Sequence, residues 1–202
     1  MGKSYFTVAD LEKITGLERK SLYVTLNRLT ASGVIERLRK NVYILFTQVN
    51  DAEKIANDTY FPCYLSFESA LSLHGILSQM PYTLTFATVR PSKKIQIGKI
   101  AVEYTHLKEE LFFGYELQDG KNIALPEKAL LDQMYVAGKG LRTLNIEELD
   151  LKKINKKRLE SFVKKYPAFV RKALLPVLQY CGSTPLTNET NDRIEWGETT
   201  SE

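Results

Sequence analysis

The chain has 202 residues and a formal net charge of +4, with 44% hydrophobic and 26% charged residues. This composition is ordinary for a globular protein, and the length suffices for a buried core in one or two domains. The two cysteines, Cys63 and Cys181, lie far apart and outside any CxxC motif or histidine cluster. The sequence therefore supports neither a disulfide framework nor a structural zinc site, and we expect two reduced, buried thiols.

The N-terminus lacks the apolar run of a signal peptide, and no stretch approaches the ~18 consecutive apolar residues of a membrane span. A cytoplasmic protein without a membrane partner is therefore expected.

Charge is unevenly distributed along the chain. Residues 1–46 contain eight Lys/Arg and four Asp/Glu, a balance of +4, whereas the remaining residues contain twenty of each. The excess positive charge is what a phosphate-facing surface requires, although a solvated surface could carry the same charges.

The N-terminal segment begins with a short predicted helix. Thr7 is a good N-cap, and Asp10 three residues later suggests a capping box. Ile14 is expected to face the core on the apolar side of this helix. Gly16 ends the helix and makes the turn, and the apolar Leu17 is expected at the inner position of that turn.

A second helix is predicted from Glu18 to Ser32. Leu22, Leu26 and Leu29 recur at the spacing of an apolar stripe on one side of a helix. Gly33 follows the helix and can adopt the left-handed backbone conformation at its end. A polar and basic surface is predicted on the side opposite the leucines.

A two-stranded wing is predicted next, with strands VIERL and VYIL joined by the turn residues RKN. Helix, turn, helix and hairpin together are typical of a winged helix-turn-helix. Basic and amide side chains on the helix and hairpin suit phosphate contact and base readout, although an ordinary exposed surface or a protein contact would use similar residues. The predicted DNA-binding residues are Arg19, Lys20, Ser21, Tyr23, Val24, Asn27, Arg28, Arg37, Arg39, Lys40 and Asn41.

The whole chain is expected to be α+β, with this winged helix-turn-helix followed by a mixed α/β domain and C-terminal helices. The predicted organisation is a DNA-binding domain in residues 1–46, a polar linker in 47–63, an α/β domain in 64–181 and a disordered tail in 182–202. A short helix is expected inside the linker, around Ala52 to Ala56.

Helical and strand-like patterns alternate in the second domain. A helix is predicted from Ser66 to Gly75, followed by the strand TLTFAT and an exposed basic loop, VRPSKK. Strand-like runs follow in IQIGKI with AVEYTHL, in LFFGYEL and in NIAL, with Asp119-Gly120 as a hairpin turn. Pro126 is expected at the first position of the next helix, which ends at Gly138.

The residues that suggest catalysis are few. His74 and His106 have no serine or cysteine nucleophile in an activating motif nearby, so a histidine satisfied by a hydrogen bond is favoured. Glu127 and Asp132 could be a pair of metal-binding carboxylates. Their five-residue spacing, however, places them about 140° apart around a helix, so they do not share one side of it. A helix-dipole role for Glu127 and a structural hydrogen bond or ion pair for Asp132 are favoured. Hence no enzyme, cofactor or metal site is predicted.

The basic loop with Arg90, Lys93 and Lys94 has three readings that the sequence leaves open. It could touch DNA that flanks an operator, touch a tRNA, or bind nothing at all. The last of these interpretations is favoured.

The order of motifs in the first two thirds of the chain resembles the AbiEi-type antitoxins of type IV toxin–antitoxin systems. The motif P-E-[KR]-A-L-L-D from Pro126 to Asp132 is one marker, and the pair Phe113-Gly114 is a weaker one. The resemblance covers roughly residues 5–140. A second strong marker is the helix with Ser66, Glu68, Ser69, Ala70, Leu71, Leu73, His74 and Gly75.

The resemblance implies a two-part protein linked to phage defence. Its winged helix would bind an inverted-repeat operator in double-stranded DNA and would repress its own operon. Because one winged helix reads few base pairs, a two-fold or repeated site is expected, with a dimer on DNA as one arrangement. Its second domain would counter a nucleotidyltransferase toxin without forming a stable complex. Two alternatives are a stand-alone regulator with a ligand-sensing or dimerising second domain, and a DNA-processing enzyme targeted by the winged helix.

Overall fold

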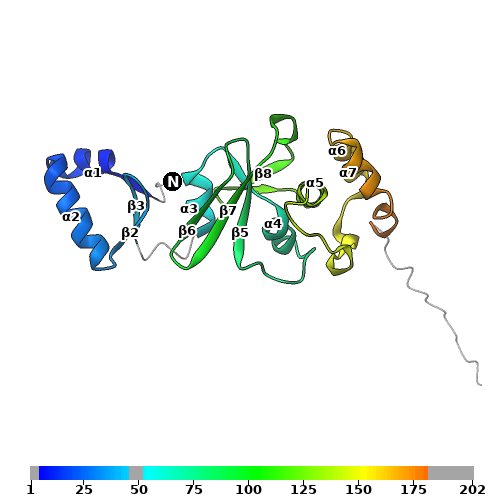
Figure 1. Ribbon diagram of the computed structural model, residues 1–202, viewed down its shortest axis with the longest axis horizontal. Helices are drawn as coiled ribbons and strands as arrows, with labels where there is room; N and C mark the ends of the chain where they lie inside the picture. Colours follow the sequence, from blue (N-terminus) through cyan, green and yellow to red (C-terminus); the bar gives the residue numbers. More distant parts are fainter. Residues whose placement is uncertain (1–4, 46–51, 182–202) are drawn as a thin grey trace, which may run out of the picture.

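The computed structural model describes residues 5–45 and 52–181, and its architecture is α+β, as the sequence predicts (Figure 1). We call residues 5–45 the N-terminal unit and residues 52–181 the sheet unit. The N-terminal unit has a three-stranded antiparallel sheet in the order β1-β3-β2. Its elements are β1 (Phe6–Thr7), α1 (Val8–Thr15), α2 (Arg19–Ala31), β2 (Ile35–Arg39) and β3 (Val42–Leu45).

The ends of α1 are set by the predicted residues. The Thr7 hydroxyl accepts from the Asp10 backbone N–H, and the Asp10 carboxylate accepts from the Thr7 N–H, which confirms the capping box. Gly16 ends the helix with a left-handed φ of 66°. The prediction that Ile14 faces the core is wrong, since its side chain is 78% exposed, and Leu17 is also exposed at 44%. The short helix buries only its opposite side, around Val8.

The sheet unit is built on six strands in the order β6-β7-β5-β4-β9-β8. Two of the pairings are parallel, β5 with β7 and β4 with β9, and the remaining pairings are antiparallel. The strands are β4 (Cys63–Leu65), β5 (Thr83–Thr88), β6 (Lys93–Ile97), β7 (Ile100–His106), β8 (Tyr115–Gln118) and β9 (Lys121–Ala124).

Each strand divides its side chains between the two faces of the sheet. In β4, Tyr64 belongs to the core beneath the helices α4 and α5, whereas Cys63 and Leu65 belong to a second core with α3. The C-terminal helices extend the first core at the end of the molecule opposite the N-terminal unit (Figure 1). The helices are α3 (Ala52–Thr59), α4 (Phe67–Leu73), α5 (Pro126–Gly138), α6 (Lys156–Val163) and α7 (Ala168–Leu174).

The predicted linker 47–63 differs from the structure in its second half. The expected short helix is present as α3, but Ile55 and Ala56 are fully buried against the sheet. They share their core with Ile44 of the N-terminal unit. Cys63, at the predicted end of the linker, opens β4 in the interior of the sheet. The predicted tail, 182–202, lies outside the described residues.

Most other predicted elements are present. TLTFAT is β5, and the two runs around Gly98 form the hairpin of β6 and β7. The run LFFGYEL is a strand only from Tyr115 onward, because residues 109–111 form a 3-10 turn. Asp119 and Gly120 both have positive φ, as a tight hairpin turn requires. No described helix is long and apolar enough to cross a membrane.

Candidate nucleic-acid interface

Helix α2 is anchored on one side and open on the other. Leu22 and Leu26 are 2% and 1% exposed and pack into the core of the N-terminal unit with Val8 and Tyr43. Leu29, the third residue of the predicted stripe, packs against this core and is half-buried. Six of the predicted DNA-binding residues of α2 are exposed to solvent. These exposed residues are Arg19, Lys20, Ser21, Val24, Asn27 and Arg28.

The hairpin of β2 and β3 supplies the second part of the surface. Its turn consists of Lys40 and Asn41, and Asn41 has a φ of 64°, a left-handed conformation that asparagine tolerates better than most residues. The pairing shifts by one residue between Arg37 and Arg39, which indicates a β-bulge. Arg37, Arg39 and Lys40 are exposed.

Tyr23 and Asn41 connect helix and hairpin. The Tyr23 hydroxyl donates a hydrogen bond of 2.8 Å to the Asn41 side-chain oxygen, and both residues are half-buried. The sequence predicts both as DNA-contacting residues. The structure gives them a shared contact that fixes the turn of the hairpin relative to α2.

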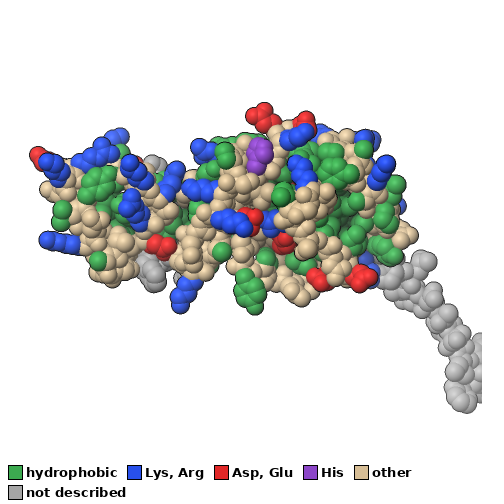
Figure 2. All heavy atoms as spheres, in the orientation of Figure 1, with side chains coloured by type: hydrophobic (Ala, Val, Ile, Leu, Met, Phe, Trp, Pro, Cys, Tyr) green, Lys and Arg blue, Asp and Glu red, His purple; other side chains and the backbone are tan. Residues whose placement is uncertain are grey.

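Positive charge on this surface is largely uncompensated. Asp10 is occupied by the capping box, Glu12 pairs with Arg19 at 3.5 Å, and Glu36 accepts the backbone N–H of Gly98. Figure 2 shows Lys and Arg side chains spread over this end of the molecule. The cations without a carboxylate in ion-pair distance among the described residues are Lys20, Arg28, Arg37, Arg39 and Lys40. Their donors are available to the phosphate oxygens of a nucleic acid.

The two carboxylates considered for catalysis, Glu127 and Asp132, are buried and are hydrogen-bonded or ion-paired to other protein groups. Glu127, in the first turn of α5, is 1% exposed. It accepts from the backbone N–H of Asn155 at 2.7 Å and lies 3.4 Å from the Arg158 guanidinium. Glu127 therefore ties α5 to the start of α6.

Asp132 is the centre of a fully buried polar cluster. It accepts hydrogen bonds from the hydroxyls of Tyr64 at 2.9 Å, Ser66 at 2.8 Å and Tyr166 at 2.7 Å, and it pairs with the Lys128 ammonium. This confirms the predicted structural role of Asp132. The carboxylate is surrounded by donors, which leaves no side open to a metal ion.

The cluster shifts the pKa of its members. Burial raises the pKa of Tyr64 and of Tyr166 well above the ordinary value, with the Asp132 charge adding to the rise. Burial lowers the pKa of Lys128, and the attraction of Asp132 opposes this. Sequence reasoning did not single out Lys128 or Tyr166. The available signal was the Lys–Asp spacing of four residues, which places the two on one side of α5.

The histidines and cysteines have structural partners. His74 Nε2 lies 2.8 Å from the Ala124 carbonyl oxygen, and His106 Nδ1 lies 3.1 Å from that of Arg90. Cys63 and Cys181 are buried free thiols, and burial raises the pKa of Cys63 to about 12. Within residues 5–45 and 52–181, no group of three or more His, Cys, Asp or Glu residues is placed to hold a metal.

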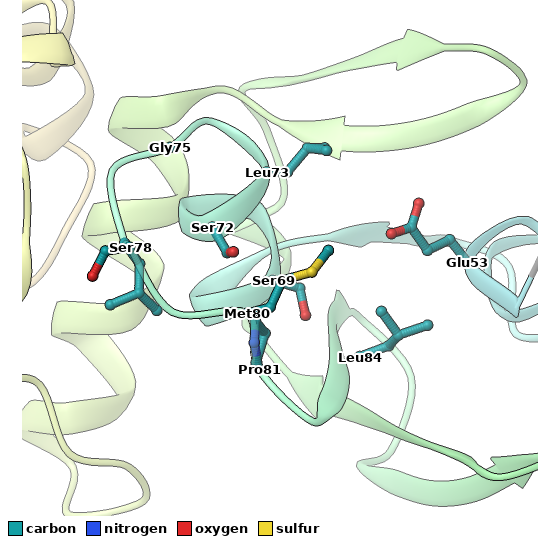
Figure 3. Close-up of a pocket in the computed structure, with 10 residues that line it drawn as sticks. Glu53, Ser69, Ser72, Leu73, Gly75, Ser78, Met80, Pro81 and Leu84 are labelled. Atoms are coloured by element: carbon teal, nitrogen blue, oxygen red, sulfur yellow. The ribbon is translucent and has the colours of Figure 1, made fainter.

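A pocket of about 430 Å³ lies beside α4 in the sheet unit (Figure 3). Leu73, Met80 and Leu84 give it an apolar lining, and Ser69 and Ser72 add hydroxyls. Its one acidic residue, Glu53, is paired with Lys121 at 2.7 Å. The pocket offers van der Waals and hydroxyl contacts rather than acid–base groups.

Comparison with known proteins supports the N-terminal assignment. Residues 1–45 match the model of a family described as "Transcriptional regulator, AbiEi antitoxin". This agrees with the resemblance seen in the sequence. No curated protein matches the chain.

One similar solved structure is the crystal structure of the RV2827C protein from Mycobacterium tuberculosis. It superposes with a TM-score of 0.57 at 17% sequence identity, over 90% of this chain and 73% of that one. At this identity the similarity shows the fold alone.

Proposed function

We propose that the N-terminal unit is a winged helix that binds duplex DNA, and that the protein is an AbiEi-type transcriptional regulator of its own operon. The observation that carries the proposal is the exposed side of α2 next to a hairpin with uncompensated cations. The bond between Tyr23 and Asn41 holds these two parts together. The family match to residues 1–45 supports the same reading.

In this proposal α2 enters the major groove as the recognition helix. Asn27 can pair with adenine through two hydrogen bonds, and Arg28 or Lys20 can bind guanine or a phosphate. The exposed cations of the hairpin bind the sugar–phosphate backbone beside the helix. One winged helix reads few base pairs, so two copies on an inverted repeat in the operon's promoter give sufficient specificity.

The sheet unit, in the same proposal, counters a nucleotidyltransferase toxin without catalysing a reaction or using a cofactor. This part rests on the similarity of residues 1–45 to an antitoxin family, which does not extend into the sheet unit. The pocket beside α4 favours the alternative of a stand-alone regulator that senses a small ligand, because its lining is apolar with a few hydroxyls.

DNA binding is tested with the complete chain and a labelled duplex from the region upstream of its gene. Changing Lys20→Glu and Arg28→Glu together should abolish operator binding while leaving thermal unfolding unchanged, because both side chains are exposed. Lys108→Glu, an exposed cation paired with Glu110 in the sheet unit, is the control and should bind normally. Equal binding by all three proteins would reject the proposed interface.

Antitoxin activity is tested by co-expression with the product of the neighbouring gene, scored as growth. Point substitutions are preferable to removal of residues 1–46, because Ile44 belongs to the core that α3 forms with the sheet. The Lys20→Glu/Arg28→Glu variant should still restore growth if neutralisation resides in the sheet unit. If the neighbouring product is not toxic, the stand-alone regulator is the better description.

A further inference from the structure

A smaller pocket of the sheet unit lies where α4 and α5 meet the segment that follows α5. The two helices pack against each other (Figure 1). The segment 142–150 is attached to the rest of the sheet unit at both of its ends. The Arg142 guanidinium pairs with Glu68 of α4 at 2.7 Å, and the Asp150 backbone N–H donates to the Ile76 carbonyl oxygen at 2.7 Å. The pocket beside this segment has a volume of about 290 Å³.

Gln133 of α5 belongs to the lining of this pocket, which we call the Gln133 pocket, and its side chain is only 1% exposed. The amide nitrogen donates to Glu68 Oε1 at 2.8 Å and to the Thr143 carbonyl oxygen at 2.9 Å. A carboxylate and a carbonyl oxygen can only accept hydrogen bonds, so the NH₂ group has to face these two partners. The orientation of the amide is therefore fixed, and its oxygen is directed elsewhere.

The Gln133 Oε1 oxygen has no hydrogen-bond partner. Among residues 5–45 and 52–181 it is the one buried side-chain nitrogen or oxygen atom in this situation. The adjacent Asp132, by contrast, accepts hydrogen bonds from several hydroxyls. An unpaired buried carbonyl oxygen is destabilising unless a donor reaches it. Because Gln133 lines a pocket, a molecule bound in that pocket can supply the donor.

The other polar residues of the lining determine which kind of donor fits. Glu148 is exposed, and the Asn145 side-chain amide donates to its Oε1 oxygen at 2.9 Å. Among the described residues, Glu148 has no cation within ion-pair distance, and no Lys, Arg or His lines the pocket. The second carboxylate of the lining, Glu68, is already paired with Arg142. The polar lining therefore favours a ligand that carries positive charge and N–H donors.

The rest of the lining is apolar. It consists mainly of the four leucines Leu71, Leu77, Leu144 and Leu149. Leu77 and Leu149 are joined by an isolated β-bridge, which fixes this wall of the pocket. A hydrocarbon group of a ligand would be removed from water against these side chains. The volume of the pocket lies at the lower end of the range for ligand sites, so only a small molecule fits.

We propose that the Gln133 pocket binds a small organic cation, in which an ammonium or guanidinium group is joined to a short hydrocarbon chain. One N–H of the cation donates to Gln133 Oε1, a second faces the Glu148 carboxylate, and the chain packs on the leucines. This activity is separate from the DNA binding proposed for the N-terminal unit and does not depend on it.

The test titrates the complete chain with n-butylguanidinium or n-butylammonium chloride at constant ionic strength, followed by calorimetry and by ¹H–¹⁵N NMR. One or both cations should bind and should shift the side-chain amide signals of Gln133 and the backbone amide signals of residues 143–149. n-Butanol lacks the charge and tetramethylammonium lacks N–H donors. Both should bind at least about tenfold more weakly, because each loses a charge-assisted hydrogen bond.

Two substitutions examine the polar contacts separately. Glu148→Gln removes the uncompensated charge and should weaken cation binding roughly tenfold or more. Glu147→Gln is the matched control, because this neighbouring glutamate is also exposed but lies outside the lining, and it should bind like the unchanged protein.

Gln133→Met keeps an unbranched side chain and removes the unpaired oxygen, so it should also weaken binding roughly tenfold. Its thermal unfolding is measured alongside, because the residue is buried. If this variant does not fold, the shift of the Gln133 amide signals in the unchanged protein decides whether the residue contacts the cation.

The inference is overturned if neither butyl cation binds, or if the shifted signals lie outside the pocket. It is also overturned if tetramethylammonium binds as tightly as the butyl cations, since the Gln133 oxygen would then take no part. Equal weakening by Glu147→Gln and Glu148→Gln would overturn it as well, because the effect would then come from the general charge of the surface. The Lys20→Glu/Arg28→Glu variant should bind the cations normally, so failure of this site and failure of DNA binding are distinguishable.

Discussion

Helices α2 and α5 have the same length, thirteen residues, yet the charged residues of α2 are exposed and those of α5 are buried. Only two residues of α2 are buried, and Lys20 and Arg28 stand in solvent without ion pairs among the described residues. In α5 ten residues are buried, and they include Glu127, Lys128 and Asp132. The comparison teaches that a charged residue type does not itself indicate a binding site. Whether other elements pack over the helix decides if a charged side chain is exposed to a binding partner or is buried in contact with a neighbouring residue.

The largest expected effect comes from breaking the buried pair of α5. Lys128→Ala should lower the free energy of unfolding by about 3–5 kcal/mol, because it leaves the Asp132 carboxylate uncompensated inside the core. Urea denaturation of the complete chain measures this. Lys94→Ala removes a surface ion pair with Glu103 and should cost under about 1 kcal/mol. Equal losses for the two lysines would contradict the contrast between buried and exposed charges.

A smaller effect is expected at the link between α2 and the hairpin. Tyr23→Phe removes the hydroxyl that bonds to Asn41 and should destabilise the fold by about 0.5–1.5 kcal/mol. DNA affinity should also fall, but its salt dependence should not change, because no charge is lost. Tyr180→Phe, at an exposed tyrosine, is the matched control. A changed salt slope in Tyr23→Phe would mean that the hydroxyl contributes to phosphate binding directly.

The smallest effect is expected at Ile14, which the apolar pattern places in the core and the structure leaves exposed. Ile14→Ser should change the free energy of unfolding by no more than about 0.5 kcal/mol, since the side chain remains largely exposed to solvent in the folded protein. Leu26→Ala, in the buried stripe of α2, should cost about 2–5 kcal/mol. A loss at Ile14 that approaches the loss at Leu26 would show that this surface is covered, for example by a second copy of the chain.

Elements whose signals are local were predictable. The capping box of Thr7 and Asp10, the ends of α2, the Asp119-Gly120 turn and the start of α5 at Pro126 all follow from residues within one or two turns of each other. Backbone hydrogen-bond demands and left-handed φ values arise from neighbours in the chain, so the sequence displays them directly.

The interface was predictable only in part. The residues of α2 and the hairpin could be named from the pattern, but the contact of Tyr23 with Asn41 joins positions eighteen residues apart. The docking of the hairpin on the sheet joins Glu36 to Gly98, which lies 62 residues further along the chain, and no local pattern encodes this contact.

The sequence by itself determined the helix, turn, helix and hairpin of the N-terminal unit, and the positive charge on it. Only the tertiary structure decided that Cys63–Leu65 is an interior strand, that Lys128 is buried with Asp132, and that the hairpin docks on the sheet edge. The physical reason is that local backbone preferences act over a few residues. Burial and pairing instead depend on which distant segments close over a residue, and their free energy belongs to the assembled core.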